Sequence, residues 1–269
     1  MKLPAWLTSI IGTSVNQDQA RDDSTDNSPT DHEMQQALDI LHQMVKPAVF
    51  GKIGGEKPQK DNRATSWWGG NFLGAEGELV PVCQTSGRPL HPLIQIRVDE
   101  LPNVPPTLSD IALLTMWIDL YDIPFHDAEN GNGFSIRTYR EVDGLVPVGP
   151  GYRESDAMPT FPVLWGGCSL DQPSWNDIEF KVPSSVARSD DTDWFFESQY
   201  ITETNKYDSS FPVKVGGWPS WIQGENWPRS GDFCFQINSI SKGRFNVGDS
   251  GSLYLFRTPT GWAIRADFY

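Results

Sequence analysis

A set of short sequence patterns occurs twice in this chain, in the same order, and constrains the fold more than any other feature. Each copy has a Gly-Gly pair, a run centred on a Gln, an apolar run, and a run that ends in Arg. The first copy comprises Gly69-Gly70, 93–96, 111–118 and 134–137, and the second comprises Gly216-Gly217, 234–237, 253–256 and 262–265. Short apolar runs between turn residues are typical of β-strands. We therefore expect two pseudo-symmetric β units that share one core.

The composition agrees with a β-rich chain. Its 269 residues can bury a substantial core, and 24 Gly and 21 Pro favour many turns over long helices. The fold class that we predict is α+β and predominantly β, with internally duplicated β units and an N-terminal helix. Strands are predicted at 92–98, 111–120, 134–140, 161–165, 177–182, 211–215, 233–238, 252–257 and 261–268.

One long helix is predicted near the N-terminus, over residues 31–46. Thr30 and Glu33 have the spacing of a capping box, and apolar residues at helical spacing follow from Met34 onward. Pro47 ends the pattern. The domain organisation that we predict is a flexible acidic leader (1–30), this helix, and a single β-rich domain (47–269) with repeat units at about 60–150 and 209–269 and an acidic connecting segment at about 151–208.

The charge of the chain restricts its partners. The formal net charge is −14, which opposes direct binding to nucleic acid or to anionic lipid and favours a basic partner. Residues 171–208 hold nine acidic and three basic residues together with several aromatic ones. The Asp-rich run at 190–193 has two interpretations: a solvated loop, or a surface in which carboxylates steer a basic partner and aromatic rings anchor it.

The cysteines and the N-terminus bear on the compartment. Cys83, Cys168 and Cys234 are odd in number, lack a C-x-x-C spacing and neighbour apolar or Gly residues. We expect buried free thiols in a reducing compartment. No run reaches the length of a membrane span, and residues 1–11 make a poor signal peptide because Pro4 interrupts them and no A-x-A site follows. These features predict a cytoplasmic protein.

Few motifs carry chemistry. Gly248-Asp249-Ser250-Gly251 has the pattern of a serine nucleophile, but no histidine lies in a suitable context, so a hairpin turn is the preferred interpretation. The segment 127–133 is expected to be an Asn-Gly turn rather than a calcium loop. We predict no catalytic set, no cofactor and no metal site. Gln95 and Gln236 are expected to be buried amides that hold neighbouring loops, with ligand binding as the alternative, and Arg137 and Arg265 to have matching structural roles.

Several of these segments together resemble the YwqG-like proteins, a bacterial family of unknown function. The resemblance covers roughly residues 60–269 and depends on 86–96 with 100–102, on the Gly-Gly-x-Pro element at 216–219, on the Gln strand at 233–237 and on the Gly-Asp-x-Gly turn that leads into 252–256. It departs at the first Gly-Gly, where Gly69-Gly70 lacks the proline and Gly54-Gly55 competes for the position. The resemblance implies a mostly β fold with pseudo-symmetry and no established reaction. Some members resemble immunity proteins encoded beside antibacterial toxins, including nuclease effectors of type VI secretion.

The function that we expect is therefore that of a non-enzymatic binding protein. More specifically, we predict a cytoplasmic immunity protein that neutralises a basic protein toxin, with a nuclease as the candidate. The predicted contact residues are Trp175, Asp190, Asp191, Asp193, Trp194 and Glu197. The alternatives are a small-ligand or peptide scaffold with a pocket between the two repeats, and a hydrolase of unfamiliar type that uses Ser250 or carboxylates.

Overall fold

A computed structural model of the protein describes residues 28–55, 64–125, 128–148, 158–188 and 211–269. Its main feature is one antiparallel sheet with the strand order β12-β11-β10-β9-β1-β8-β2-β4-β5-β6. The bounds are β1 Lys46–Ile53, β2 Trp67–Trp68, β4 His91–Arg97, β5 Leu113–Ile118, β6 Phe134–Tyr139, β8 Phe161–Asp171, β9 Val213–Gly216, β10 Asp232–Asn238, β11 Ser252–Thr258 and β12 Gly261–Asp267. The predicted fold class, predominantly β with an N-terminal helix, is confirmed.

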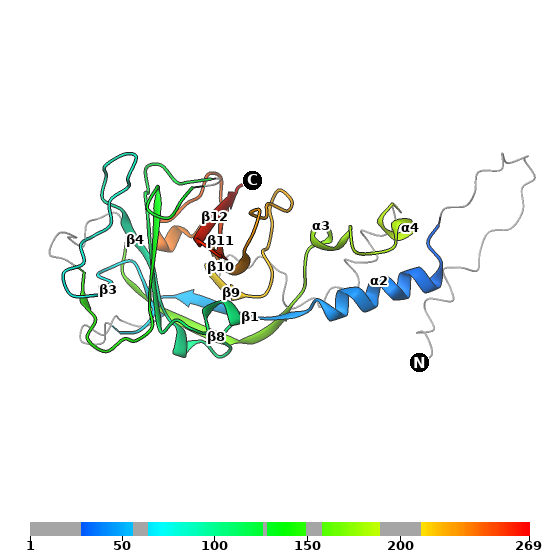
Figure 1. The fold of residues 1–269 in the computed structure, drawn as a ribbon, viewed down its shortest axis with the longest axis horizontal. Coiled ribbons are helices and arrows are strands. Elements are labelled where there is room, and N and C mark those ends of the chain that lie inside the picture. The colour runs from blue at the N-terminus through cyan, green and yellow to red at the C-terminus, as the bar shows by residue number, and fades with distance from the viewer. Residues whose placement is uncertain (1–27, 56–63, 126–127, 149–157, 189–210) are drawn as a thin grey trace, which may run out of the picture.

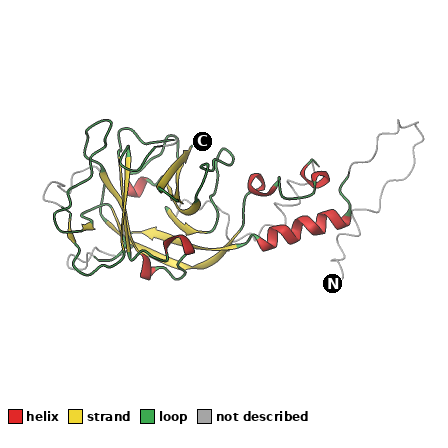
Figure 2. Cartoon of the chain, viewed as in Figure 1, coloured by secondary structure: helices red, strands yellow, loops and turns green. Residues whose placement is uncertain are grey.

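The sheet curls until its two edges nearly meet (Figure 2). Glu129, which precedes β6, forms a bridge with Ala263 of the opposite edge strand β12. The amide of Ala266 in β12 also donates a hydrogen bond to the carbonyl of Phe125. A separate pair of short strands, β3 (Leu73–Gly74) and β7 (Val146–Pro147), lies beside the sheet. Short 3-10 turns occur at Val98–Glu100 (η1), Pro106–Leu108 (η2) and Ser241–Gly243 (η3).

The predicted repeats occupy corresponding places in the sheet. Strands β2, β4, β5 and β6 form the first half, β9 to β12 form the second, and β1 and β8 lie between them. In the first half Gln95 lies opposite Thr115, which lies opposite Arg137; in the second half Gln236, Tyr254 and Arg265 form the same row. Both Gln strands carry a register shift just before the Gln, between 92 and 94 and between 233 and 235. That the halves arose by duplication stays a prediction.

The main core fills the inside of the curled sheet. Alternate residues of every long strand point inward, including Ile94, Met116, Ile237, Leu255 and Ile264, and all are buried. The outer face of each half is covered by the chain that follows its Gly-Gly pair. This cover forms a second apolar cluster over the first half and a cluster of aromatic rings over the second.

A helical arm projects from this body (Figure 1). The arm, defined here as residues 28–45 and 172–188, contains α2 (Asp31–Gln43), α3 (Trp175–Ile178) and α4 (Ser184–Ala187). Its own small core consists of Ala37, Leu41, Ile178, Val182 and Val186. The arm continues the two central strands, because α2 leads into β1 and β8 leads into α3, and Lys46 pairs with Asp171 where the arm meets the body.

The structure confirms some predicted elements and corrects others. The helix with its capping box at Thr30 is present and ends at Gln43, close to the predicted bound. The strand predicted at 177–182 is wrong, because a capping box of Ser174 and Asp177 begins α3 instead. The apolar residues Ile178 and Val182 satisfy both a strand and a helix pattern, and packing against α2 selects the helical one. Within the described ranges, no helix is long and apolar enough to cross a membrane.

Candidate functional site

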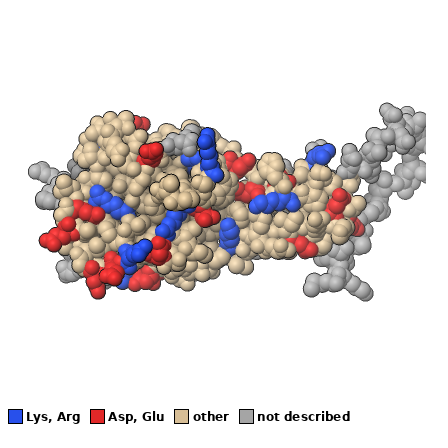
Figure 3. Space-filling view, in the orientation of Figure 1, with Lys and Arg blue, Asp and Glu red and all other residues tan. Residues whose placement is uncertain are grey.

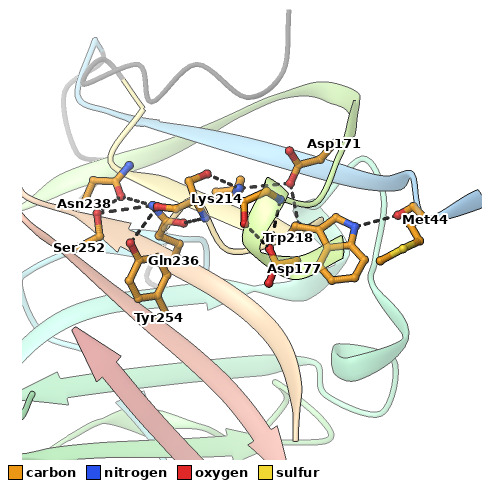
Figure 4. A network of polar contacts seen from close by, with 11 residues as sticks. Met44, Asp171, Asp177, Lys214, Trp218, Gln236, Asn238, Ser252 and Tyr254 are labelled. Atoms are coloured by element: carbon orange, nitrogen blue, oxygen red, sulfur yellow. Dashed lines mark hydrogen bonds and ion pairs between the residues drawn. The ribbon is translucent and has the colours of Figure 1, made fainter. Parts of the chain in front are cut away.

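The junction between arm and body is the most elaborate polar site of the described chain. It lies on the outer face of the second half, under the covering segment 217–230 (Figure 4). Asp171 there contacts Lys214 and the backbone amide of Trp218, and both contacts are buried. The indole groups of Trp218, Trp221 and Trp227 also form hydrogen bonds at this junction. These contacts join the arm to the body.

Asp177 ties the arm to the body. Its Oδ2 accepts hydrogen bonds from the amide and the hydroxyl of Ser174, at 3.1 and 2.8 Å. Ser174 is the N-cap residue of α3. Its Oδ1 accepts the indole N–H groups of Trp221 and Trp227, at 3.1 and 2.7 Å. One carboxylate therefore caps a helix of the arm and binds two side chains of the covering segment. Ser-x-x-Asp is a recognisable capping signal, so the sequence contains evidence for this helix start.

Trp218 makes the second tie, to the end of α2. Its indole nitrogen donates a hydrogen bond of 2.8 Å to the carbonyl of Met44, the C-cap residue of that helix. The ammonium of Lys46 lies 3.7 Å from the centroid of the Trp218 ring, and burial lowers the pKa of this lysine. Helix C-termini leave carbonyl groups without partners inside the helix, and Trp218 satisfies one of them. Both helical segments of the arm are thus held by tryptophans of the body.

A buried ion pair lies beneath these contacts. Lys214 Nζ lies 3.2 Å from Asp171 Oδ2, and the two side chains are 4% and 0% exposed. The same Asp171 oxygen accepts the amide of Trp218 at 2.7 Å, while Lys214 also contacts the hydroxyl of Ser220 at 2.6 Å. The Gly217 that precedes Trp218 has φ +69°, and a Cβ there would lie 2.9 Å from the Cβ of Ala48. The Gly-Gly turn is therefore required for the chain to pass over the pair.

A chain of amide and hydroxyl groups continues the site along the sheet. Gln236 accepts the amide of Ser220 at 2.9 Å and donates to Asn238 at 2.7 Å. Ser252 also donates to Asn238, and the hydroxyl of Tyr254 donates to the carbonyl of Ser220 at 2.8 Å. Burial raises the pKa of the Tyr254 phenol, which stays protonated as a donor. Both backbone groups of Ser220 are thus satisfied by strand side chains.

The first half uses its Gln in the same way. Gln95 accepts the amide of Leu73 at 2.9 Å and donates to the carbonyl of Thr65 at 2.7 Å. Leu73 follows Gly69 by four residues, as Ser220 follows Gly216. The prediction that both amides hold loops is confirmed, since both are buried and bonded to backbone. This use of the amides weighs against a ligand pocket that contains either of them.

Other predicted details have mixed outcomes. Gly248 and Ser250 take left-handed φ values of 52° and 59° in the connection that leads to β11, as a turn requires. Asn130 lies in the turn before β6, and its side chain accepts a hydrogen bond from the amide of Ile136 and donates one to the carbonyl of Ile136. Cys83 and Cys234 are buried free thiols, but Cys168 is exposed on β8, which corrects the expectation of three buried thiols. In the described ranges no cluster of three or more His, Cys, Asp or Glu residues forms a candidate metal site.

The arrangement favours structural support over catalysis. The contact of Lys214 with Ser220 resembles the Ser–Lys pairs of some hydrolases. Here, however, the ammonium is also paired with Asp171, and Ser220 belongs to the turn that the network holds in place.

The predicted contact residues are only partly placed. Trp175 is the first residue of α3 and packs, half-buried, against the core of the arm. The remaining five, Asp190, Asp191, Asp193, Trp194 and Glu197, lie outside the described residues. Sequence reasoning missed Asp171, Asp177 and Lys214, because the two acids look like other members of an acidic segment and burial depends on partners far along the chain.

Comparison with known proteins identifies a family without an assigned activity. A family model described as a domain of unknown function (DUF1963) matches residues 66–263, most of the chain. The comparison with curated proteins gave no match.

Proposed function

Because the chain belongs to the DUF1963 family of domains of unknown function, we propose its function from the structure: it is a non-enzymatic binding protein whose helical arm contacts a protein partner. The observation that carries the proposal is the junction. A buried ion pair, three indole hydrogen bonds and a shared carboxylate all serve to hold a small helical projection in a fixed position. Fixing a recognition element before binding lowers the entropic cost of association.

The arm presents an aromatic side chain to solvent. Phe180, between α3 and α4, is 82% exposed, although its neighbours Ile178 and Val182 are buried in the core of the arm. Leu170, at the end of β8 beside the arm, is 53% exposed. Single exposed apolar residues are common, but an exposed ring on a fixed projection has the properties of an interface anchor. Phe180 is the side chain that we assign to the centre of the contact.

The charge of the chain indicates the kind of partner. The acidic run that contains Asp190, Asp191 and Asp193 follows α4 directly in the sequence, and the formal net charge of the chain is −14. On one face of the described surface, charges of both signs are interspersed (Figure 3). The acidic run supports a basic partner, since opposite charges speed association. A basic protein toxin, with a nuclease as the candidate, is the partner that we propose for a cytoplasmic immunity protein.

Co-expression with a candidate toxin tests the proposal. The gene next to this one is expressed in a host with and without this protein, survival is scored, and the two proteins are tested for co-purification. We expect toxicity alone, survival together, and a complex. A harmless neighbour that does not co-purify contradicts the immunity function.

Two variants then test the arm itself. Phe180→Asp is expected to weaken the complex by about 2 kcal/mol, the loss typical of an aromatic anchor. Leu79→Asp is the matched control, because Leu79 is 71% exposed on the body. Reversal of Asp190, Asp191 and Asp193 to Lys is expected to slow association, most strongly at low salt. Equal effects of the Phe180 and Leu79 variants would place the interface away from the arm.

A further inference from the structure

The sheet has an open edge at its centre, along strand β8. Over Phe161 and Pro162 this strand lies between β1 and β2, but β2 has only two residues. From Leu164 to Asp171 the strand keeps its pairing with β1, and no described strand pairs with it on the other side. Most of β8 is therefore an edge strand, although it occupies a central place in the strand order.

The backbone of β8 presents hydrogen-bonding groups at this edge. Leu170 lies opposite Pro47 of β1, whose carbonyl oxygen is 2.9 Å from the place that a Cβ on Gly216 of β9 would take. Two opposed residues of an antiparallel pair either bond each other or both face away from each other. Because Pro47 faces β9, the backbone groups of Leu170 face the open side, as do those of Cys168 two residues earlier.

The side chains of β8 do not protect the edge. Residues 163–170 contain no charged residue and no proline, and Cys168 and Leu170 are exposed. The register shift against β1 falls at Gly166-Gly167, and a Cβ on Gly167 would have no neighbour within 4 Å. Glycine inside a strand often marks a place where another backbone approaches closely. The edge is thus accessible to an added strand.

The two outer edges of the same sheet are treated differently. On β6, the side chain of Asn130 bonds the amide and the carbonyl of Ile136. On β12, Ala263 forms a bridge with Glu129. Proteins protect sheet edges in such ways against pairing with other chains. An unprotected edge beside two protected ones is expected where pairing with another chain is the function of the edge.

We propose that an extended segment of the protein partner adds to β8 as a further strand. The inference rests on the proposed function for the identity of this partner. Strand β8 continues directly into the arm that carries Phe180, so one partner can contact both. Main-chain hydrogen bonds give an added strand its affinity, and alternate apolar side chains of that strand would contact Leu170. The net charge of −14 opposes pairing of β8 between two copies and favours a basic segment.

Hydrogen exchange of individual amides, followed by NMR on the full chain, tests the inference. The probes are the protein encoded by the neighbouring gene and a short acetylated peptide of alternating valine and lysine. In the free protein the amides of Cys168 and Leu170 should exchange fast, and that of Ser169, which faces β1, slowly. We expect at least one probe to slow exchange at Cys168 and Leu170 about tenfold or more and to leave Ser169 unchanged.

The outcomes separate this inference from the proposed function. A complex with the neighbour's protein in which both edge amides stay fast, together with no effect of the peptide, overturns the inference and leaves the proposed function standing. Protection by the peptide without any complex with the neighbour's protein supports strand addition and contradicts the immunity function. Protection that grows with the concentration of the free protein assigns the edge to a second copy and overturns the inference, as does a lack of protection by both probes.

Cys168→Pro is the decisive variant, because it removes an edge amide that has no strand partner in the described sheet. It is expected to weaken probe binding about tenfold or more, through the lost hydrogen bond and the obstructing ring, while the urea midpoint stays near that of the wild type. Cys168→Ala, which keeps the amide, is the matched control and should bind as the wild type does. Leu170→Lys places a charge at the edge and should also weaken binding, which keeps the test open if the proline variant does not fold. Unchanged binding by Leu170→Lys and by a folded Cys168→Pro overturns the inference.

Discussion

The two halves of the sheet share a framework but cover their outer faces differently. Trp67 on β2 and Lys214 on β9 take the same place, each opposite the Gln of its half. Around Trp67 the cover is apolar, with Phe72, Leu90 and Trp117 packed on it. Around Lys214 the cover is a polar network that continues into the arm. The same strand arrangement can therefore carry either a closed apolar core or the base of a projection. The difference follows from the side chain at this position, Trp67 or Lys214, and from the segment that covers it.

The largest expected effect comes from breaking the buried ion pair. Lys214→Met leaves the carboxylate of Asp171 buried without its cation, which costs about 3–5 kcal/mol. Trp67→Phe at the matching place is expected to cost less, about 1 kcal/mol, because the indole nitrogen of Trp67 is buried without a hydrogen-bond partner. Urea unfolding measures both. The double variant Asp171→Asn with Lys214→Met should regain part of the loss, and equal costs of the two single variants would mean that the halves do not differ here.

The next prediction concerns what the halves share. Gln95→Leu and Gln236→Leu each leave a buried backbone amide without its acceptor, at Leu73 and at Ser220. Each variant is expected to lose about 1–3 kcal/mol of unfolding free energy. The two losses should agree within about 1 kcal/mol if the roles correspond, given the usual spread of such values. A neutral effect at one Gln, measured by the same urea titration, would break the correspondence.

A smaller effect, confined to the arm, is expected from Asp177→Asn. The amide nitrogen of Asn cannot accept from Ser174, so the start of α3 and its tie to the body weaken together. Hydrogen exchange in α2 and α3 should speed up about tenfold, which corresponds to ~1.4 kcal/mol of local stability. Exchange in β10 and β11 should stay unchanged. Asp39→Asn, on the exposed side of α2, is the control, and a global increase in exchange would show that arm and body unfold as one unit.

The smallest effect tests a contact between the halves. Arg257 of β11 pairs with Asp110, which precedes β5, and its hydrogen bonds lower the pKa of Asp110 from 3.8 to about 2. A carboxyl group whose pKa is lower in the folded state stabilises the fold above its ordinary pKa and loses this contribution as the pH falls from about 4 to about 2.

Both partners are partly exposed, so the contribution is expected to be about 0.5 kcal/mol. Urea midpoints of the wild type and of Asp110→Asn should differ at pH 6 and converge near pH 2. A difference that persists at pH 2 would assign the effect of the variant to something other than the charge.

The longer strands of both halves were predictable because their signals are local, whereas the two-residue strand β2 was not predicted. Turn residues separate the apolar runs, and the Gln residues mark equivalent rows. The central strand β1 was not predicted as a strand, since its segment Lys46–Ile53 shows no clear alternation and has two neighbours distant in sequence. Its pairing with β8 and β9 exists only in the assembled sheet.

The candidate site was less predictable than the fold. Asp171 and Asp177 lie in a segment rich in acids, where solvated charge is the usual interpretation. Their partners Lys214, Trp221 and Trp227 are more than forty residues away, and burial of the acids follows from those contacts. A capping motif at Ser174 is a local signal that could have distinguished Asp177, but the segment was predicted as a strand. No comparable local signal exists for Asp171.

The attachment of the arm to β1 and β8 has a mechanical consequence. Both strands lie at the centre of the sheet, and both enter the arm at the same end. In an antiparallel sheet the hydrogen bonds run perpendicular to the strands. A force applied to the arm along these strands is therefore shared as shear by many bonds at once, instead of opening them one after another. A molecule pulling on the arm would therefore load the pairing of β1 with β9 and of β8 with β2 in shear.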